Sequence, residues 1–90
     1  MIKAGDRTKE FTRSRVVLGR ARDADFQLDD PNVSRRHAVL YWSEGGVMVE
    51  DLDSTNGTMV NGYPISSTIL RPQDVLVIGD TRIKVEIKPR

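Results

Sequence analysis

The 90-residue chain contains no cysteine and only one histidine, which excludes disulfide bonds and thiolate metal sites. No apolar run approaches the roughly 20 residues that span a bilayer, and no secretory signal opens the chain. Aromatic residues are also scarce, at 6%. From these absences we expect a cytoplasmic protein that does not insert into a membrane and needs no oxidising compartment.

Helix patterns are nearly absent, whereas short strand-like segments recur along the chain. No window of about 11 residues carries apolar residues at helical spacing between capping residues. Runs of β-branched and aromatic residues, bounded by Gly, Asn, Asp and Pro, predict strands at 16–18, 26–28, 37–42, 46–50, 58–60, 63–65, 75–78 and 81–87. Many short strands separated by turn residues predict an all-β sandwich or barrel.

Three dipeptides predict tight turns between these strands. Asn61-Gly62 is the strongest short hairpin signal, and we expect Gly45-Gly46 and Gly79-Asp80 to close two further hairpins. The first 13 residues are polar and weakly patterned. There we expect two short edge strands, anchored by Ile2 and Phe11.

The composition predicts one small domain over residues 1–90, either complete or cut from a longer protein. We expect the isolated domain to be a monomer. The formal net charge is only +1 and stacking aromatics are few, so we expect no nucleic-acid partner. Ten of the fourteen basic residues are arginine, a bias that suits recognition of oxyanions.

Polar side chains stand at the ends of several predicted strands. Gly19-Arg20 ends the first strand, residues 34–37 (Ser-Arg-Arg-His) precede the third, and residues 53–57 (Asp-Ser-Thr-Asn-Gly) separate two others. Each segment alone is typical of an ordinary surface turn, because Gly, Asn, Asp and Ser favour turns. Together they supply arginines, hydroxyl groups and an amide, which can hold a doubly charged phosphate.

A calcium loop is the first alternative for the third segment, because Asp51, Asp53 and Thr55 alternate as EF-hand ligands do. Such a loop requires glycine where Asn56 stands and glutamate where Gly62 stands. The sequence therefore excludes an EF-hand, and we expect no metal.

An enzyme is the second alternative, with Ser34 and His37 in a hydrolytic triad. Ser34 lies on no nucleophile-elbow pattern, and residues three apart on extended backbone point to opposite faces. The chain also has no Gly-rich loop followed by Lys-Ser or Lys-Thr and no metal-ligand cluster. We therefore expect neither catalysis nor a cofactor, and a structural role for His37.

In order and separation, four motifs resemble the signature of the forkhead-associated (FHA) family: Gly19-Arg20, Ser34-x-x-His37, residues 54–58 and Asn61-Gly62. The resemblance covers residues 15–88. It implies a β-sandwich of two twisted sheets with the ligand loops at one end. The implied function is non-catalytic recognition of phosphothreonine peptides, and the implied partner is a protein modified by a Ser/Thr protein kinase.

The resemblance also implies residue roles. The residues implied to bind the phosphothreonine are Arg20, Ser34, Arg35 and Thr55. Asn56 is implied to hold the peptide backbone. The residues implied to shape the loops without touching the ligand are Gly19, His37 and Gly57. To these we add three candidates for reading the flanking residues, namely Asn32, Arg36 and Asn61.

Two residues depart from or vary within the family pattern. Gln73 stands where the family often has glycine, in the turn before Asp74. Arg35 is a long cation at a variable position, where it either strengthens phosphate binding or selects an acidic neighbour.

The alternative to the phosphothreonine function is a phosphate-independent interaction or assembly module that uses a sheet face.

Overall fold

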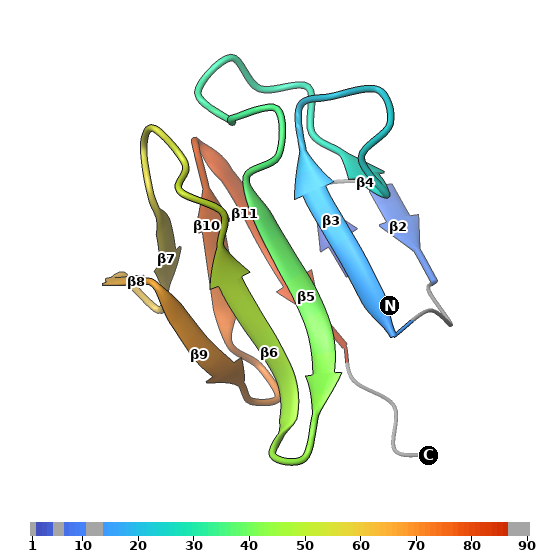
Figure 1. Cartoon of the computed structure of the whole chain (residues 1–90), viewed down its shortest axis with the longest axis vertical. Helices are drawn as coiled ribbons and strands as arrows, with labels where there is room; N and C mark the ends of the chain where they lie inside the picture. Colours follow the sequence, from blue (N-terminus) through green and yellow to red (C-terminus); the bar gives the residue numbers. More distant parts are fainter. Residues whose placement is uncertain (1, 5–6, 11–13, 87–90) are drawn as a thin grey trace.

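The structure is a computed structural model that describes residues 2–4, 7–10 and 14–86. Two β-sheets pack face to face, and the described residues contain no helix (Figure 1). Accordingly, no helix in this part of the chain is long and apolar enough to cross a membrane. The predicted two-sheet β-sandwich is confirmed.

The first sheet has six strands in the order β2-β1-β11-β10-β7-β8, all antiparallel to their neighbours. Its strands are β1 (Ile2–Ala4), β2 (Arg7–Lys9), β7 (Thr58–Val60), β8 (Tyr63–Ile65), β10 (Val75–Ile78) and β11 (Thr81–Val85). Asn61 and Gly62 join β7 to β8 with φ angles of 52° and 85°. These left-handed angles are the ones that a tight hairpin turn requires, as the dipeptide predicted.

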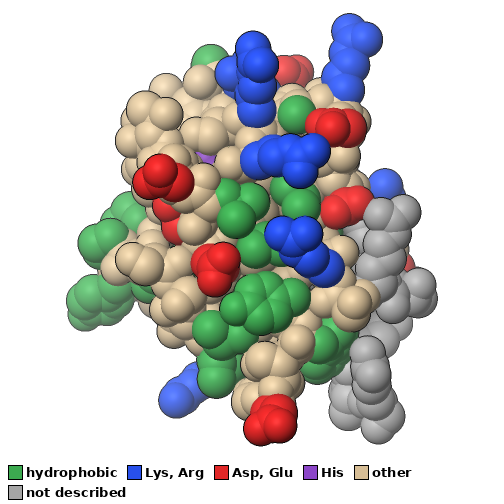
Figure 2. Space-filling model, viewed as in Figure 1, with side chains coloured by type: hydrophobic (Ala, Val, Ile, Leu, Met, Phe, Trp, Pro, Cys, Tyr) green, Lys and Arg blue, Asp and Glu red, His purple; other side chains and the backbone are tan. Residues whose placement is uncertain are grey.

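The second sheet has five strands in the order β4-β3-β5-β6-β9. Its strands are β3 (Arg15–Gly19), β4 (Phe26–Gln27), β5 (Ala38–Ser43), β6 (Gly46–Asp51) and β9 (Ser67–Leu70). Only β3 and β4 run parallel. The outer face of this sheet is seen in Figure 2, with apolar side chains near its centre and basic side chains gathered above them.

The core forms where inward-facing side chains of the two sheets meet, because alternate residues of a strand point to opposite faces. Its buried members are Val16, Leu18, Phe26, Leu28, Val33, Ala38, Leu40, Val47, Val49, Val60, Leu70, Leu76, Ile78 and Ile83. Burial of each large aliphatic side chain stabilises the fold by about 1.5–3 kcal/mol. The core therefore holds the strand ends, and the loops between them, in fixed positions.

Three details differ from the sequence prediction. Strand β9 was not predicted, because its Ser67-Thr68 start lacks an apolar alternation, and pairing with β6 forms it instead. The β5–β6 turn lies at residues 44–45, one residue earlier than predicted, since Gly46 already pairs with Ser43. Strand β1 is internal, between β2 and β11, and is not an edge strand.

Two predicted strand residues, Phe11 and Ile87, lie outside the described residues. The connections that carry three of the four sequence motifs lie together with the β10–β11 turn at one end of the sandwich (Figure 1). They are the β3–β4 loop, the β4–β5 loop, the β6–β7 loop and the β10–β11 turn. Hydrogen bonds between these connections form the candidate site.

Candidate functional site

Gly19 allows the β3–β4 and β4–β5 loops to approach each other. A Cβ atom at this position would lie 2.0 Å from the carbonyl oxygen of Arg35, a distance that no side chain tolerates. The backbone N–H of Arg20 donates to the carbonyl of Ser34 at 3.0 Å, and that of Ala21 donates to the carbonyl of Arg35 at 3.1 Å. The two motifs are thus joined through their backbones.

The side chain of Arg20 extends over the β4–β5 loop. Its Nε donates to the carbonyl of Val33 at 3.0 Å, and the residue is exposed. Within the described part of the chain, its two terminal nitrogens have no hydrogen-bond partner and no carboxylate pairs with it. The guanidinium is therefore held in place by one bond while most of its donors face solvent.

Ser34 links the β4–β5 loop to the β6–β7 loop. Its Oγ accepts a hydrogen bond from the backbone N–H of Thr55 at 3.1 Å, and its own backbone N–H donates to Nδ1 of His37 at 3.0 Å. Because Oγ is the acceptor in the first bond, the hydroxyl proton remains available to a ligand. Thr55 itself is exposed beside it.

His37 is fully buried and joins the same two loops through its two ring nitrogens. Nδ1 accepts from the N–H of Ser34, so the ring proton belongs on Nε2, which lies 2.7 Å from the carbonyl oxygen of Gly57 and donates to it. One neutral tautomer satisfies both partners. Gly57 has a φ of 82°, a left-handed angle that favours glycine.

Asp51 organises the β6–β7 loop from within. Its carboxylate accepts hydrogen bonds from the hydroxyls of Ser54 and Thr58, at 2.5 and 2.6 Å, and from the N–H of Ser54 at 3.1 Å. Burial raises the pKa of Asp51, but these bonds together outweigh burial, and the pKa lies below its ordinary value. The carboxylate therefore stays ionised and holds Thr55 and Asn56 in position.

Asn56 contacts the β4–β5 loop through its side chain. Its Nδ2 donates to the carbonyl of Asn32 at 2.8 Å, which leaves the amide oxygen exposed beside Thr55. Asn32 in turn donates from Nδ2 to the carboxylate of Asp80, in the β10–β11 turn, at 2.7 Å. The three residues form a chain of contacts across the end of the sandwich.

Asp30 fixes the β10–β11 turn against the β4–β5 loop. Its carboxylate accepts from the N–H of Asn32 at 2.9 Å, and from the Thr81 hydroxyl and the Asp80 N–H, each at 2.8 Å. The bond from Asn32, followed by those from Thr81 and Asp80, lowers the pKa of Asp30. Gly79 leaves room for this carboxylate, since a Cβ there would lie 2.9 Å from Oδ2.

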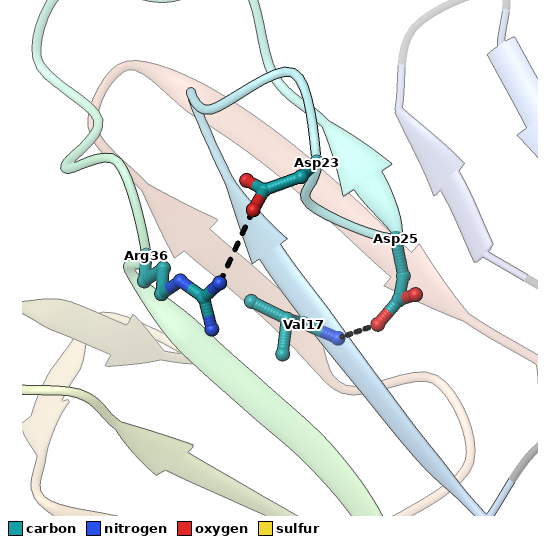
Figure 3. Close-up of polar contacts among 4 residues, drawn as sticks. All are labelled: Val17, Asp23, Asp25 and Arg36. Carbon is teal, nitrogen blue, oxygen red and sulfur yellow. Dashed lines mark hydrogen bonds and ion pairs between the residues drawn. The ribbon is translucent and has the colours of Figure 1, made fainter.

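The two arginines after Ser34 differ in their surroundings. Arg36, in the β4–β5 loop, pairs with Asp23, in the β3–β4 loop, at 3.2 Å, and both side chains are largely exposed (Figure 3). Arg35 is exposed and has no ion pair among the described residues. In the same view, the carboxylate of Asp25 accepts from the N–H of Val17 at 2.8 Å, which covers an otherwise open edge of β3.

Asn61 is the one predicted site residue that the structure does not bring to this end. It follows β7 at the end away from Thr58, where its side chain bonds Asp74 and the N–H of Val75, each at 2.9 Å. Its amide is thus used in tying two turns together. The Arg71–Asp74 turn also contains Gln73, whose φ of 72° is the left-handed angle that glycine would adopt there.

The other predicted site residues lie in one connected cluster. Sequence reasoning missed the residues that support it, namely Asp30, Asp51 and Asp80. Asp51 and Asp30 could have been identified as turn formers, since each bonds a residue two or three positions ahead. No local signal indicates Asp80, because its partner Asn32 is 48 residues away.

The cluster has the chemistry of an oxyanion site. Arg20 and Arg35 supply guanidinium groups that no carboxylate of the described residues pairs with, Ser34 and Thr55 supply hydroxyls, and Asn56 supplies an amide. Guanidinium and hydroxyl donors can satisfy the oxygens of a phosphate through charge-assisted hydrogen bonds. A small β-sandwich with such a site on its loops is a peptide- or anion-recognition module.

Comparison with known proteins places this module in a family. The model of the FHA domain matches residues 16–79, and the chain belongs to this family. The chain is 38% identical over 81 residues to the FHA domain-containing protein FhaA of Mycobacterium tuberculosis, an alignment that covers 90% of this chain and 15% of FhaA. It therefore corresponds to a small part of that relative.

Two further comparisons agree. The chain is 45% identical over 68 residues to the oxoglutarate dehydrogenase inhibitor of Corynebacterium efficiens, covering 76% of this chain and 48% of the inhibitor. A solved structure from work on phosphothreonine-dependent FHA domain interactions is 36% identical, with a TM-score of 0.90. That superposition covers 99% of this chain and 96% of the other.

Proposed function

We propose that this domain binds peptides that carry phosphothreonine and does not cleave the phosphate. The proposal rests on one observation, the position of two donors. The terminal nitrogens of Arg20, which have no partner among the described residues, lie over the β4–β5 loop, and the Ser34 hydroxyl in that loop still has a hydrogen to donate. Membership of the FHA family supports it, as does the similarity to a domain studied for phosphothreonine-dependent interactions.

The charge of the ligand suits this donor set. Phosphothreonine carries about −1.5 to −2 charges and three acceptor oxygens near neutral pH. Each charge-assisted hydrogen bond contributes roughly 1.5–3 kcal/mol, so four contribute about 6–12 kcal/mol before the costs of association. A short phosphopeptide should therefore bind with a Kd on the order of 1 μM, or about −8 kcal/mol.

Each residue of the cluster has a role in this proposal. Arg20 and Ser34 bind the phosphate, and Arg35 and Thr55 add contacts from the loops on either side. Asn56 binds the peptide backbone next to the phosphothreonine through the amide oxygen that its bond to Asn32 leaves free. The carboxylates of Asp30 and Asp51 and the imidazole of His37 hold these loops and are not proposed to touch the ligand.

Preference for phosphothreonine over phosphoserine is part of the proposal. Burial of the extra methyl group contributes about 0.8 kcal/mol, which corresponds to roughly four-fold in affinity. A larger ratio requires the methyl group to orient the phosphate as well.

Among the residues that the structure describes, no group of the site is placed to activate water. Both ring nitrogens of His37 already have partners, the N–H of Ser34 and the carbonyl of Gly57. The carboxylate of Asp51 is occupied by three internal donors. We therefore expect the domain to bind the phosphothreonine without hydrolysing it. As part of the same proposal, a Ser/Thr protein kinase adds the phosphate, and binding takes place in the cytoplasm.

The experiment is a calorimetric titration with one degenerate peptide pool in three forms, containing phosphothreonine, phosphoserine or unmodified threonine. We expect heat of binding for the phosphothreonine pool, weaker binding for phosphoserine and none for threonine. Binding should weaken below about pH 6, where the phosphate gains a proton. Equal binding of all three forms, or of none, would contradict the proposal.

Arg20→Ala is the variant that tests the site itself. Loss of one charge-assisted contact of about 1.5–3 kcal/mol lowers affinity by roughly 10- to 150-fold. Arg22→Ala is the matched control, because Arg22 is an exposed arginine in the same loop. Unfolding curves of both variants separate loss of binding from loss of fold.

A second function is favoured by the outer face of the five-stranded sheet. Tyr41, Met48 and Ile69 are register neighbours there, and Ile69 is 41% exposed. Such an apolar row can support phosphate-independent assembly. Concentration-dependent sedimentation of the wild type, abolished by Ile69→Ser, would favour this alternative.

A further inference from the structure

The ligand end of the sandwich is divided by charge. The cationic half consists of residues 20–22 and 35–36, which hold four arginines. The other half consists of residues 29–34, 51–57 and 79–81, which hold five aspartates and no lysine or arginine. A phosphate suits the first half, together with Ser34 and Thr55, which are bonded to each other and are the residues proposed to bind phosphate from the second half. The aspartates of the second half repel negative charge and attract positive charge.

Within the second half, Asp30 and Asp51 are used internally by the hydrogen bonds of their own loops. Asp80 differs because it is exposed on the β10–β11 turn. One of its carboxylate oxygens accepts from Asn32, and within the described residues the other has no hydrogen bond and no cation is paired with it. The position of Asp80 is nevertheless well defined, since its backbone N–H is bound by Asp30.

Asp80 also lies close to Asn56, the residue proposed to hold the peptide backbone. Asn56 donates to the carbonyl of Asn32 at 2.8 Å, and Asn32 donates to Asp80 at 2.7 Å. One asparagine therefore separates the free carboxylate from the residue proposed to hold the peptide backbone. The two hydrogen bonds and one asparagine limit this span to at most roughly 10 Å, or about three residues of extended peptide.

We infer that Asp80 selects a lysine or arginine in the ligand, two or three residues from the phosphothreonine on the side held by Asn56. The inference rests on the proposed phosphothreonine function and adds the charge of the partner sequence to it. The preferred ligand thus carries charges of both signs, with its phosphate bound by the arginines of the first half and its basic residue beside Asp80 of the second half.

The expected size of the preference follows from the exposure of Asp80. An exposed ion pair changes affinity by about two- to five-fold at low salt. Screening should reduce the preference at high salt, because the Debye length falls from about 10 Å at 0.1 M to about 3 Å at 1 M.

The test uses a phosphothreonine peptide with alanine at the four positions on either side, labelled for fluorescence anisotropy. Lysine and glutamate then replace each alanine in turn, and the measured quantity is the ratio of affinities for the lysine and alanine peptides. We expect a ratio of about two to five at one position, two or three residues from the phosphothreonine, and a ratio below one for glutamate.

Asp80→Asn removes the charge while retaining an oxygen that can accept from Asn32, so the ratio should fall to about one. Asp53→Asn is the matched control, because Asp53 is an exposed aspartate of the same half and should leave the ratio unchanged. A lysine-to-alanine affinity ratio that stays above one in Asp80→Asn, or falls to one in Asp53→Asn, would overturn the inference. Failure of the alanine peptide to bind wild-type protein would instead overturn the proposed function.

Discussion

The Oγ of Ser34 accepts a hydrogen bond from the backbone N–H of Thr55 at 3.1 Å, across 21 residues of sequence. One hydroxyl therefore does two things. As an acceptor it joins the β4–β5 and β6–β7 loops, and as a donor it remains available to an oxyanion beside Arg20.

Ser34→Ala should consequently affect binding more than stability. Loss of the bond to an exposed loop N–H should cost about 0.5–1.5 kcal/mol of unfolding free energy, because water can replace it. Phosphopeptide affinity should fall by more than about 10-fold, since a charge-assisted bond to phosphate is lost as well. Urea unfolding and calorimetry on the same preparation measure the two effects, and equal losses in both would make the role of Ser34 structural.

Gly19→Ala tests the close approach of two loops. The added methyl would lie 2.0 Å from the carbonyl oxygen of Arg35, so the backbone must move, at a cost of about 1–3 kcal/mol or more. We expect a lower Tm together with loss of phosphopeptide binding, because the displaced loop carries Ser34.

Gly62→Ala is the control for that variant. Gly62 has open space around it but a φ of 85°, so alanine should cost about 1–2 kcal/mol through backbone strain alone. It lies in the β7–β8 turn, away from the site, and binding should persist. Loss of binding in both variants would show that reduced stability, not loop geometry, is the cause.

Acid should destabilise the fold through carboxylates that are hydrogen-bonded only when folded. The pKa of Asp30 is lowered mainly by the N–H of Asn32, and that of Asp74 mainly by the N–H of Arg71. For Asp51, burial raises the pKa, but hydrogen bonds from Ser54 and Thr58 lower it further than burial raises it.

A folded-state pKa below the unfolded value means that the folded protein binds fewer protons. The stabilisation is therefore fully present above about pH 4 and is lost as pH falls through the folded-state pKa values. Urea midpoints between pH 6 and pH 2.5 measure the loss. Asp51→Asn should flatten this dependence, and an unchanged slope would exclude Asp51 as a contributor.

Gln73→Gly should stabilise the protein. Gln73 has a φ of 72°, and a left-handed angle costs a non-glycine residue roughly 1–2 kcal/mol. Glycine loses about 0.5–1 kcal/mol more in unfolded-state entropy, so the net gain is about 0–1.5 kcal/mol, and each 1 kcal/mol raises Tm by about 4–8 °C. Asn61→Gly should instead lower Tm, since the Asn61 side chain bonds Asp74 and Val75. A lower Tm for Gln73→Gly would show that the glutamine side chain stabilises the turn.

Local patterns in the sequence were sufficient for most of the fold. Asn61-Gly62 predicted its hairpin because the backbone angles of a tight turn depend on the two residues within it. The alternation of apolar and polar residues around Ile83 predicted a half-buried strand, because successive side chains of a strand point to opposite faces. Strand β9 was missed because its Ser67-Thr68 start lacks an apolar alternation, and pairing with β6 forms it instead.

The sequence by itself determined the class of the fold, the turns, and which residue types stand at the strand ends, because these depend on neighbours along the chain. Only the tertiary structure decided which of those residues meet. It joined Ser34 to Thr55, bound His37 to Gly57, placed Asp80 beside Asn32 and left Asn61 at the far end. The physical reason is that such contacts depend on strand order and on the packing of two sheets, which no local pattern encodes.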